Sequence, residues 1–239
     1  MIIDLEDFIS KYTLQDVKEL EHQDPQFLAL QNCWENINRK NENLFLFLVI
    51  QCAIVSYQIA WSGEQWWSEA WEKFLDDWDY LLNLWNDNKQ NGDWRLDFLK
   101  TSKNNKRIYN IKKSRIDKLN MKFENKNDLI KYQNKLCELN DKLAKIMGCK
   151  TSSKTIVFAI KMFGYACTII TWKDIEYPMS INIPLDSRIK KIYSVCTSSN
   201  QKNDDKSILL YFENLSKKFK ISPLDLDAVL WLKYRNTMK

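Results

Sequence analysis

Residues 143–155 decide the fold of this chain, and they read Leu-Ala-Lys-Ile-Met-Gly-Cys-Lys-Thr-Ser-Ser-Lys-Thr. We expect a helix, a hairpin turned by Gly148 and a second helix, because glycine readily adopts the left-handed conformation that ends a helix. Lys154 opens the second helix, and residues 156–170 are apolar on nearly every side. Such a helix is predicted to be enclosed by others.

The rest of the chain also has the pattern of helices. Capping sequences predict helix starts at Thr13, Asp24, Ser62 and Ser222. Residues 62–85 place tryptophans at a helical period on one face, and residues 127–147 are predicted to form one helix. The 239 residues include four glycines and four prolines, too few for a turn-rich β structure. We therefore predict an all-α fold.

The cysteine and histidine content argues against a metal site. The six cysteines contain no Cys-x-x-Cys pair, and the only histidine is His22. We predict no metal and no other cofactor, and we expect reduced, buried thiols in a cytoplasmic protein. The acidic start of the chain lacks the basic segment of a signal peptide.

Residues 44–61 are nearly all apolar and approach the length of a membrane span. Gln51, Ser56 and Gln58 interrupt this run, so we expect a buried core helix and no membrane. A helical scaffold or membrane-associated protein built on the run is the alternative.

Basic residues gather between Lys100 and Lys118, where Asp117 is the single acid. Such a stretch suits contacts with nucleic-acid phosphates. A solvated, lysine-rich surface would give the same pattern, and composition does not separate the two.

Lys154 and Asp186 are the candidate reactive pair. An amine at a helix start and a carboxylate just after Pro184 can supply a nucleophile and its electrostatic partner, the chemistry needed to cleave an N-glycosidic bond through a covalent lysine intermediate. The helix dipole and partial burial are both expected to disfavour the protonated amine. A plain surface lysine in a first helical turn is the alternative. Backbone N–H groups of the preceding hairpin can bind a DNA phosphate.

The hairpin and the lysine after it resemble the helix-hairpin-helix superfamily of DNA glycosylases. Within it, the chain resembles the archaeal 8-oxoguanine DNA glycosylases known as AGOG. The hairpin has one glycine instead of two, and the iron–sulfur cysteines of other branches are absent. The matching blocks, in family order, are residues 24–26, 62–67, 154–158, 161–166, 183–188 and 223–232.

The resemblance implies one catalytic unit, residues 1–239, made of two helical subdomains with an active-site cleft between them. A middle segment of about residues 62–180 would contain the helix-hairpin-helix, and the N- and C-terminal segments would pack together. The resemblance further implies that Lys154 attacks C1′ of the damaged nucleotide with Asp186 as its carboxylate partner. The implied pocket for the flipped base consists of Gln26, Trp67, Phe158, Pro184, Asp227 and Trp231. The implied DNA-binding residues are Gly148, Lys150, Ser152 and Ser153.

In this pocket Phe158 and Trp231 would stack on the base. Ordinary core packing is the alternative for both rings, and Asp227 could simply complement its helix dipole. Trp66 competes with Trp67 for the pocket position.

The activity implied is that of a bifunctional 8-oxoguanine DNA glycosylase and AP lyase, which works through a lysine Schiff base and β-elimination. Its partner would be double-stranded DNA containing 8-oxoguanine, with single-stranded DNA left open. The protein would act as a monomer at the nucleoid of an archaeal cell. A non-catalytic helix-hairpin-helix DNA-binding protein is the alternative function.

Overall fold

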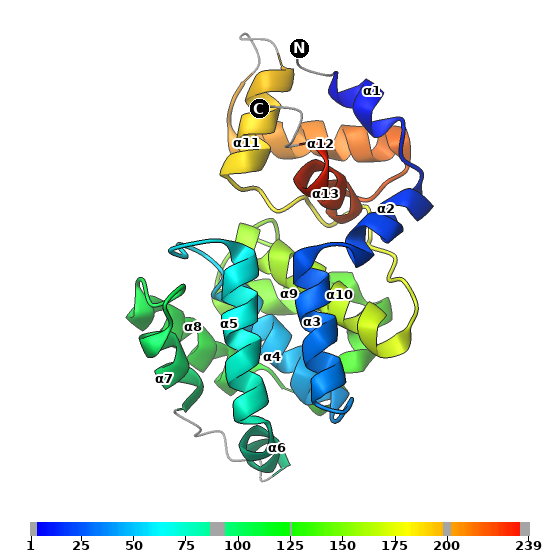
Figure 1. Ribbon diagram of the computed structural model, residues 1–239. Helices are drawn as coiled ribbons and strands as arrows, with labels where there is room; N and C mark the ends of the chain where they lie inside the picture. The colour runs from blue at the N-terminus through cyan, green and yellow to red at the C-terminus, as the bar shows by residue number, and fades with distance from the viewer. Residues whose placement is uncertain (1–3, 87–93, 125, 198–201, 235–239) are drawn as a thin grey trace.

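The computed structural model describes residues 4–86, 94–124, 126–197 and 202–234, and within these ranges every regular element is a helix (Figure 1). The predicted all-α fold is therefore confirmed. The elements are α1 (Leu5–Ile9), α2 (Leu14–His22), α3 (Pro25–Asn36), α4 (Glu42–Ile54), α5 (Gly63–Asp76), α6 (Trp78–Asn86), α7 (Trp94–Thr101), α8 (Tyr109–Lys122), the 3₁₀ helix η1 (Lys126–Asn134), α9 (Leu136–Met147), α10 (Lys154–Thr171), α11 (Ser187–Cys196), α12 (Asp205–Phe219) and α13 (Pro223–Leu232).

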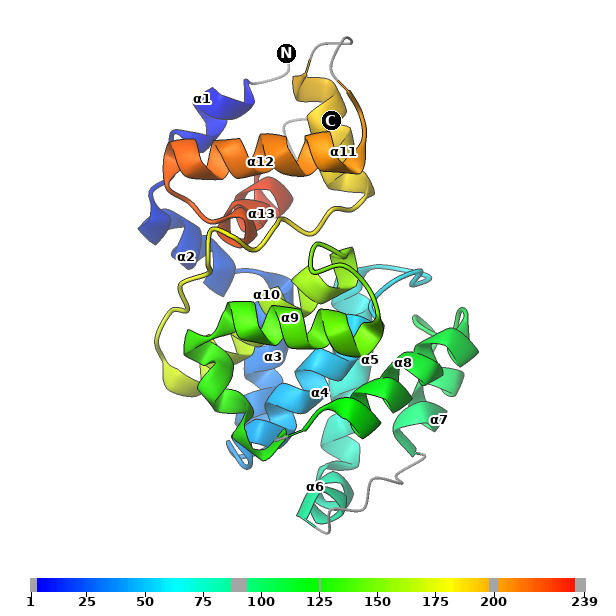
Figure 2. The ribbon, with the colours of Figure 1, turned by 180° about the vertical axis from the view of Figure 1, so that it is seen from behind.

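The helices form two lobes with separate hydrophobic cores (Figures 1 and 2). The larger core contains residues from Phe27 to Ile181, with Leu224 added from α13. The smaller core combines N-terminal residues with residues from Ile183 onwards, so both ends of the chain build one lobe. We propose that these cores are the two subdomains. The larger one takes in α3 and α4, although the expected middle segment began only near residue 62.

Two apolar helices, α4 and α10, form the centre of the larger lobe. Residues 44–54 of α4 are all buried, and the polar Gln51 among them donates to Asn120 Oδ1 at 2.6 Å. Of the described residues, α10 alone is long and apolar enough to cross a membrane, and 67% of it is buried inside the protein. That burial is what a core helix of a folded domain shows.

The predicted single helix over residues 127–147 is wrong. The chain forms η1 and then α9, because Asp128 and Lys135 have non-helical backbone angles (φ −127° and −139°). Asn43 accepts a hydrogen bond from the backbone N–H of Ile130 at 3.1 Å, which ties this irregular turn to the start of α4. The expectation of buried thiols is also wrong for Cys137 and Cys149, which are exposed, although all six cysteines are free.

Buried charged groups join α2 and α13 of the smaller lobe to the segment after α10, which leads into that lobe. Lys18 on α2 donates to Asp225 at 2.6 Å, to Glu21 at 2.9 Å and to the carbonyl of Ile175 at 2.9 Å. Burial raises the pKa of Glu21 to about 7, although the charge of Lys18 opposes this shift. The second carboxylate oxygen of Glu21 has no hydrogen-bond partner among the described residues.

The raised pKa of Glu21 predicts a pH-dependent stability. Between its ordinary pKa of 4.5 and about 7, the folded protein holds a proton that the unfolded chain has lost. Stability from this group therefore falls as the pH rises through that window. Glu21→Gln should remove this pH dependence. The free energy of unfolding of the variant, measured by urea denaturation, should therefore rise relative to that of the wild type between pH 5 and pH 7.5. The exposed Glu19→Gln on the same helix is the control, and parallel behaviour of Glu21→Gln and wild type would contradict the prediction.

Gly164 on α10 is predicted to be required by the close approach of Tyr177. A Cβ atom at this position would lie 2.3 Å from the Tyr177 hydroxyl, which donates to the carbonyl of Lys161 at 2.9 Å. Gly164→Ala should therefore destabilise the fold by about 1–3 kcal/mol, whereas helix propensity alone would stabilise it by about 1 kcal/mol. In a Tyr177→Ala background the same change should become neutral or favourable. Thermal denaturation of the four proteins tests this, and an equal cost in both backgrounds would count against it.

Candidate active site

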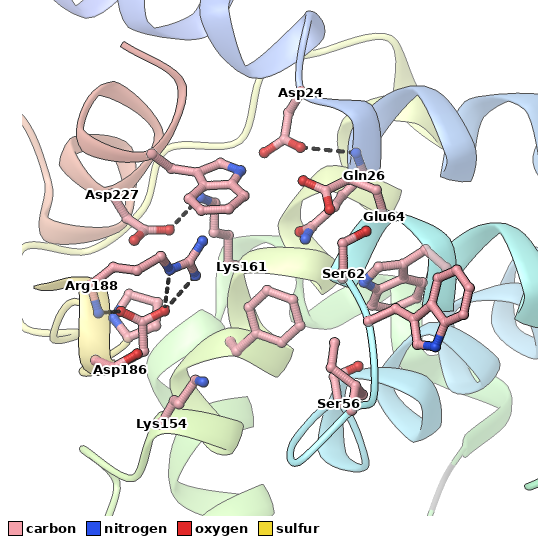
Figure 3. A pocket seen from close by; sticks show the side chains of 18 residues that line it. Asp24, Gln26, Ser56, Ser62, Glu64, Lys154, Lys161, Asp186, Arg188 and Asp227 are labelled. Atoms are coloured by element: carbon pink, nitrogen blue, oxygen red, sulfur yellow. Dashed lines mark hydrogen bonds and ion pairs between the residues drawn. The ribbon is translucent and has the colours of Figure 1, made fainter. Parts of the chain in front are cut away.

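A cavity of about 360 Å³ lies where the two lobes meet (Figure 3). Its walls come from the start of α3, the α4–α5 loop, α10, the segment before α11 and α13. All eight residues predicted for catalysis and base binding line it, namely Gln26, Trp67, Lys154, Phe158, Pro184, Asp186, Asp227 and Trp231. Five segments that are distant in sequence thus place these side chains around one cavity.

Lys154 is the first residue of α10 and follows the hairpin. Helix α9 ends at Gly148 in the left-handed conformation (φ 65°, ψ 41°), and extended backbone at Ser153 turns the chain into α10. Lys154 is exposed, so the expectation of partial burial is wrong; the first turn lies at the mouth of the cavity. Within the described part of the chain, Lys154 forms no ion pair, and its charge contributes to lowering the pKa of Asp186.

Asp186 is buried and caps α11. Its carboxylate accepts hydrogen bonds from the backbone N–H groups of Arg188 and Ile189, at 2.9 and 3.0 Å. Burial by itself raises the pKa of Asp186, but the charge of Arg188, the hydrogen bond from its side chain and that from the Ile189 N–H outweigh burial and hold the pKa below its ordinary value. Asp186 is therefore a fixed carboxylate anion beside the cavity.

Arg188 connects Asp186 to the aromatic wall. Its Nε donates to Asp186 Oδ2 at 2.7 Å, and the guanidinium carbon lies 3.6 Å from the centre of the Trp231 ring. The Arg188 side chain is half exposed, and it points from α11 into the cavity (Figure 3).

A second lysine of the cavity, Lys161, is fully engaged. Its Nζ lies 2.5 Å from Asp227 Oδ2, with the side chain only 2% exposed. Burial by itself lowers the pKa of Lys161, but the charges of Asp227 and Asp24 reverse the shift and raise it. Lys161 is thus held as an ammonium ion, which is not a nucleophile, and Lys154 is left as the candidate amine.

Asp24 completes this charged floor. It caps α3 by accepting from the Gln26 N–H at 2.9 Å, and the Tyr165 hydroxyl donates to it at 3.2 Å. Burial raises the pKa of Asp24, with Lys161 acting in the opposite direction.

Aromatic rings form the opposite wall. The Phe158 and Trp67 ring centres lie 6.4 Å apart, and the buried Trp67 Nε1 has no hydrogen-bond partner among the described residues. An unpaired buried donor is costly, so this N–H is suited to an acceptor that enters the cavity. Trp66 instead donates to Ser56 Oγ at 2.8 Å and stacks on Phe98, which places it in the core.

Gln26 has room in the cavity because Gly63 has no side chain. A Cβ atom on Gly63 would lie 3.0 Å from the Gln26 amide nitrogen. Gly63 is the first residue of α5.

The predicted DNA-binding residues Gly148, Lys150, Ser152 and Ser153 lie together in the α9–α10 turn, next to Lys154 but outside the cavity lining. The Ser153 side chain makes no capping bond, and among the described residues the N–H groups of Lys154 and Thr155 have no acceptor, so these two are available to an anion. The basic stretch contributes Arg115, which donates to Thr155 Oγ1 at 2.7 Å. Lys112 is fully buried and cannot belong to a solvated basic surface.

The sequence-based site omitted Lys161, Asp24 and Arg188. A detectable signal existed for Lys161, which lies two turns after Lys154 on the same stripe of an otherwise apolar helix. Asp24 and Arg188 each stand two residues from a predicted site residue, but spacing alone does not show that their side chains reach the cavity.

An all-helical, two-lobed fold with a lysine-bearing hairpin beside an interlobe cavity defines the class of helix-hairpin-helix DNA glycosylases. Three comparisons narrow this class. The family model described as "AGOG: N-glycosylase/DNA lyase" matches residues 6–239. The N-glycosylase/DNA lyase of Methanococcus maripaludis is 36% identical over 96% of this chain and 86% of its own length. That of Methanopyrus kandleri is 31% identical over 94% of this chain and 86% of its own.

A crystal structure of an 8-oxoguanine DNA glycosylase from Pyrobaculum aerophilum, Pa-AGOG in complex with 8-oxoguanosine, shares the fold. It superimposes with a TM-score of 0.78 over 96% of this chain and 86% of that one, at 23% sequence identity. The chain therefore belongs to the AGOG family of N-glycosylase/DNA lyases.

Asp186→Asn is predicted to separate folding from catalysis. Asparagine caps a helix about as well as aspartate, so the bonds from the N–H groups of residues 188 and 189 should persist. The negative charge beside the cavity is lost, and base release should slow by about 10²–10³-fold while DNA affinity is kept. Single-turnover excision and DNA-binding titrations measure this.

Asp204→Asn is the matched control, because Asp204 caps α12 in the same way and lies outside the cavity lining. If Asp186→Asn released base as fast as Asp204→Asn, the anion would have no role in the reaction.

Proposed function

We propose that this protein excises 8-oxoguanine from DNA and then cleaves the strand, with Lys154 as the nucleophile. The observation that carries the proposal is the charge arrangement of the cavity. Lys161 is bound to Asp227 at 2.5 Å, whereas Lys154, at the mouth beside the Asp186 anion, forms no ion pair with any described residue. Family membership supplies the pair of activities, N-glycosylase and DNA lyase. The 8-oxoguanosine bound by the Pyrobaculum relative supports the choice of base.

In the first step, the neutral amine of Lys154 forms a bond to C1′ of the damaged nucleotide. The bond from C1′ to the base breaks, and the base leaves with the electron pair and takes up a proton. The new C–N bond leaves an excess proton on nitrogen, which balances the one the base takes up. The Asp186 carboxylate stabilises the positive charge that develops on the sugar.

In the second step, the sugar ring opens to a Schiff base between Lys154 and C1′. Loss of a proton from C2′ then forms a C2′=C3′ double bond and expels the 3′ phosphate. Water hydrolyses the imine and returns the free lysine. An amine and a carboxylate are sufficient for both steps.

The walls of the cavity suit a flipped purine. A base stacked between Phe158 and Trp231 would recover about 1–3 kcal/mol of the stacking lost on leaving the duplex. The Gln26 amide and the Trp67 Nε1, which has no hydrogen-bond partner in the described part of the chain, would bind its polar edge, with Asp227 held in place by Lys161. Pro184 would close the side nearest Asp186.

We further propose double-stranded DNA as the main substrate. The backbone N–H groups of the α9–α10 turn would bind a phosphate on the strand that carries the lesion. We also propose that the enzyme acts as a monomer. The archaeal relatives support a place among the enzymes that act on chromosomal DNA inside the cell.

Lys154→Gln tests the nucleophile directly. The variant should lose 8-oxoguanine release, strand cleavage and borohydride trapping to DNA, because the Schiff base cannot form without the amine. Incubation with an 8-oxoguanine duplex and borohydride, followed by denaturing gel electrophoresis, measures the trapped complex.

Lys145→Gln is the control, since Lys145 is an exposed lysine in the last turn of α9. It should trap like the wild type. A trapped complex with Lys154→Gln would refute the assignment, and an undamaged duplex should yield none with either protein.

A further inference from the structure

Arg188 contacts both the Trp231 ring and the Asp186 carboxylate. Its guanidinium lies against the Trp231 ring at 3.6 Å and is bonded to Asp186 Oδ2, and all three residues line the same cavity (Figure 3). An aromatic base stacked on this ring would lie at about the same distance from it as the guanidinium does, so the two groups would occupy the same space. The cavity side of Trp231 is therefore shared between Arg188 and any base that enters.

We propose that Arg188 is a positioning residue that covers the base-stacking face of Trp231 in the free protein and moves to a DNA phosphate when the flipped base arrives. This inference rests on the proposed function, because it needs a base to stack on Trp231. It goes beyond that function by coupling entry of the base to a change at Asp186.

Displacement of Arg188 changes Asp186 without releasing it. The carboxylate loses the bond from the Arg188 side chain but keeps the backbone bonds from residues 188 and 189 at Oδ1. Oδ2 then becomes free to face the sugar, while Oδ1 still anchors the group to the start of α11. In the free protein, by contrast, the guanidinium shields the same oxygen.

A phosphate is the destination that the chemistry of Arg188 favours. The side chain is half exposed and stands near the same mouth as Lys154, where the sugar–phosphate backbone must pass for C1′ to reach the amine. Guanidinium groups bind phosphate oxygens through two parallel hydrogen bonds, which a lysine cannot reproduce.

Arg188→Gln tests the inference with two readouts that should move in opposite directions. Free 8-oxoguanosine should bind about fivefold more tightly to the variant, because no cation–π contact has to be broken first. On duplex DNA the variant should bind more weakly, and the slope of log Kd against log salt concentration should fall by about 0.9, the value for one phosphate contact. The N–H of residue 188 still donates to Asp186, so the α11 cap does not depend on the side chain.

Lys190→Gln is the matched control, because Lys190 is an exposed cation on the same helix that pairs with Asp205 outside the cavity lining. It should leave nucleoside affinity unchanged and keep the wild-type salt slope. Weaker nucleoside binding by Arg188→Gln, or an unchanged salt slope, would overturn the role of Arg188 while the wild type still excises 8-oxoguanine. A wild type that neither binds the nucleoside nor excises the base would instead refute the proposed function, and the inference with it.

Discussion

The buried ion pair between Lys161 and Asp227 is the interaction on which the rest of the site depends. It joins α10 of the larger lobe to α13 of the smaller lobe at 2.5 Å, in the floor of the cavity. Two charges at such a depth are costly to desolvate, and removing either would leave the other uncompensated. The pair therefore fixes how the lobes meet, and with that the separation between the Phe158 and Trp231 walls.

The same pair divides the chemical work between two lysines of one helix. Carboxylates surround Lys161 and hold it protonated. Lys154 lies two turns earlier, at the N-terminus of α10, where the helix dipole is positive. One fold thus keeps a permanent cation and a candidate nucleophile in one cavity. Asp186, fixed by helix capping and by Arg188, stands on the other side of the mouth.

The amino-acid sequence was sufficient for the helical class, the hairpin, the family and eight of the residues around the cavity. Periodicity and capping patterns are local, and α2, α3, α5 and α13 begin where those patterns predicted. Local patterns failed where tertiary contacts decide the backbone, as at Lys135, where the expected helix is broken. They also misjudged the burial of Lys154 and missed the ion pair of Lys161, because its partner lies 66 residues away. The roles of the cavity residues remain predictions.

The order in which the cavity walls appear along the chain has a consequence for its synthesis. Asp227 and Trp231 belong to α13, the last of the described helices to leave a ribosome, whereas Lys154 is made far earlier. Until α13 docks, Lys161 has no Asp227 to pair with, and one wall of the base site is missing. An unfinished polypeptide therefore contains Lys154 without Asp227 and Trp231, so the cavity is complete only after the smaller lobe has formed.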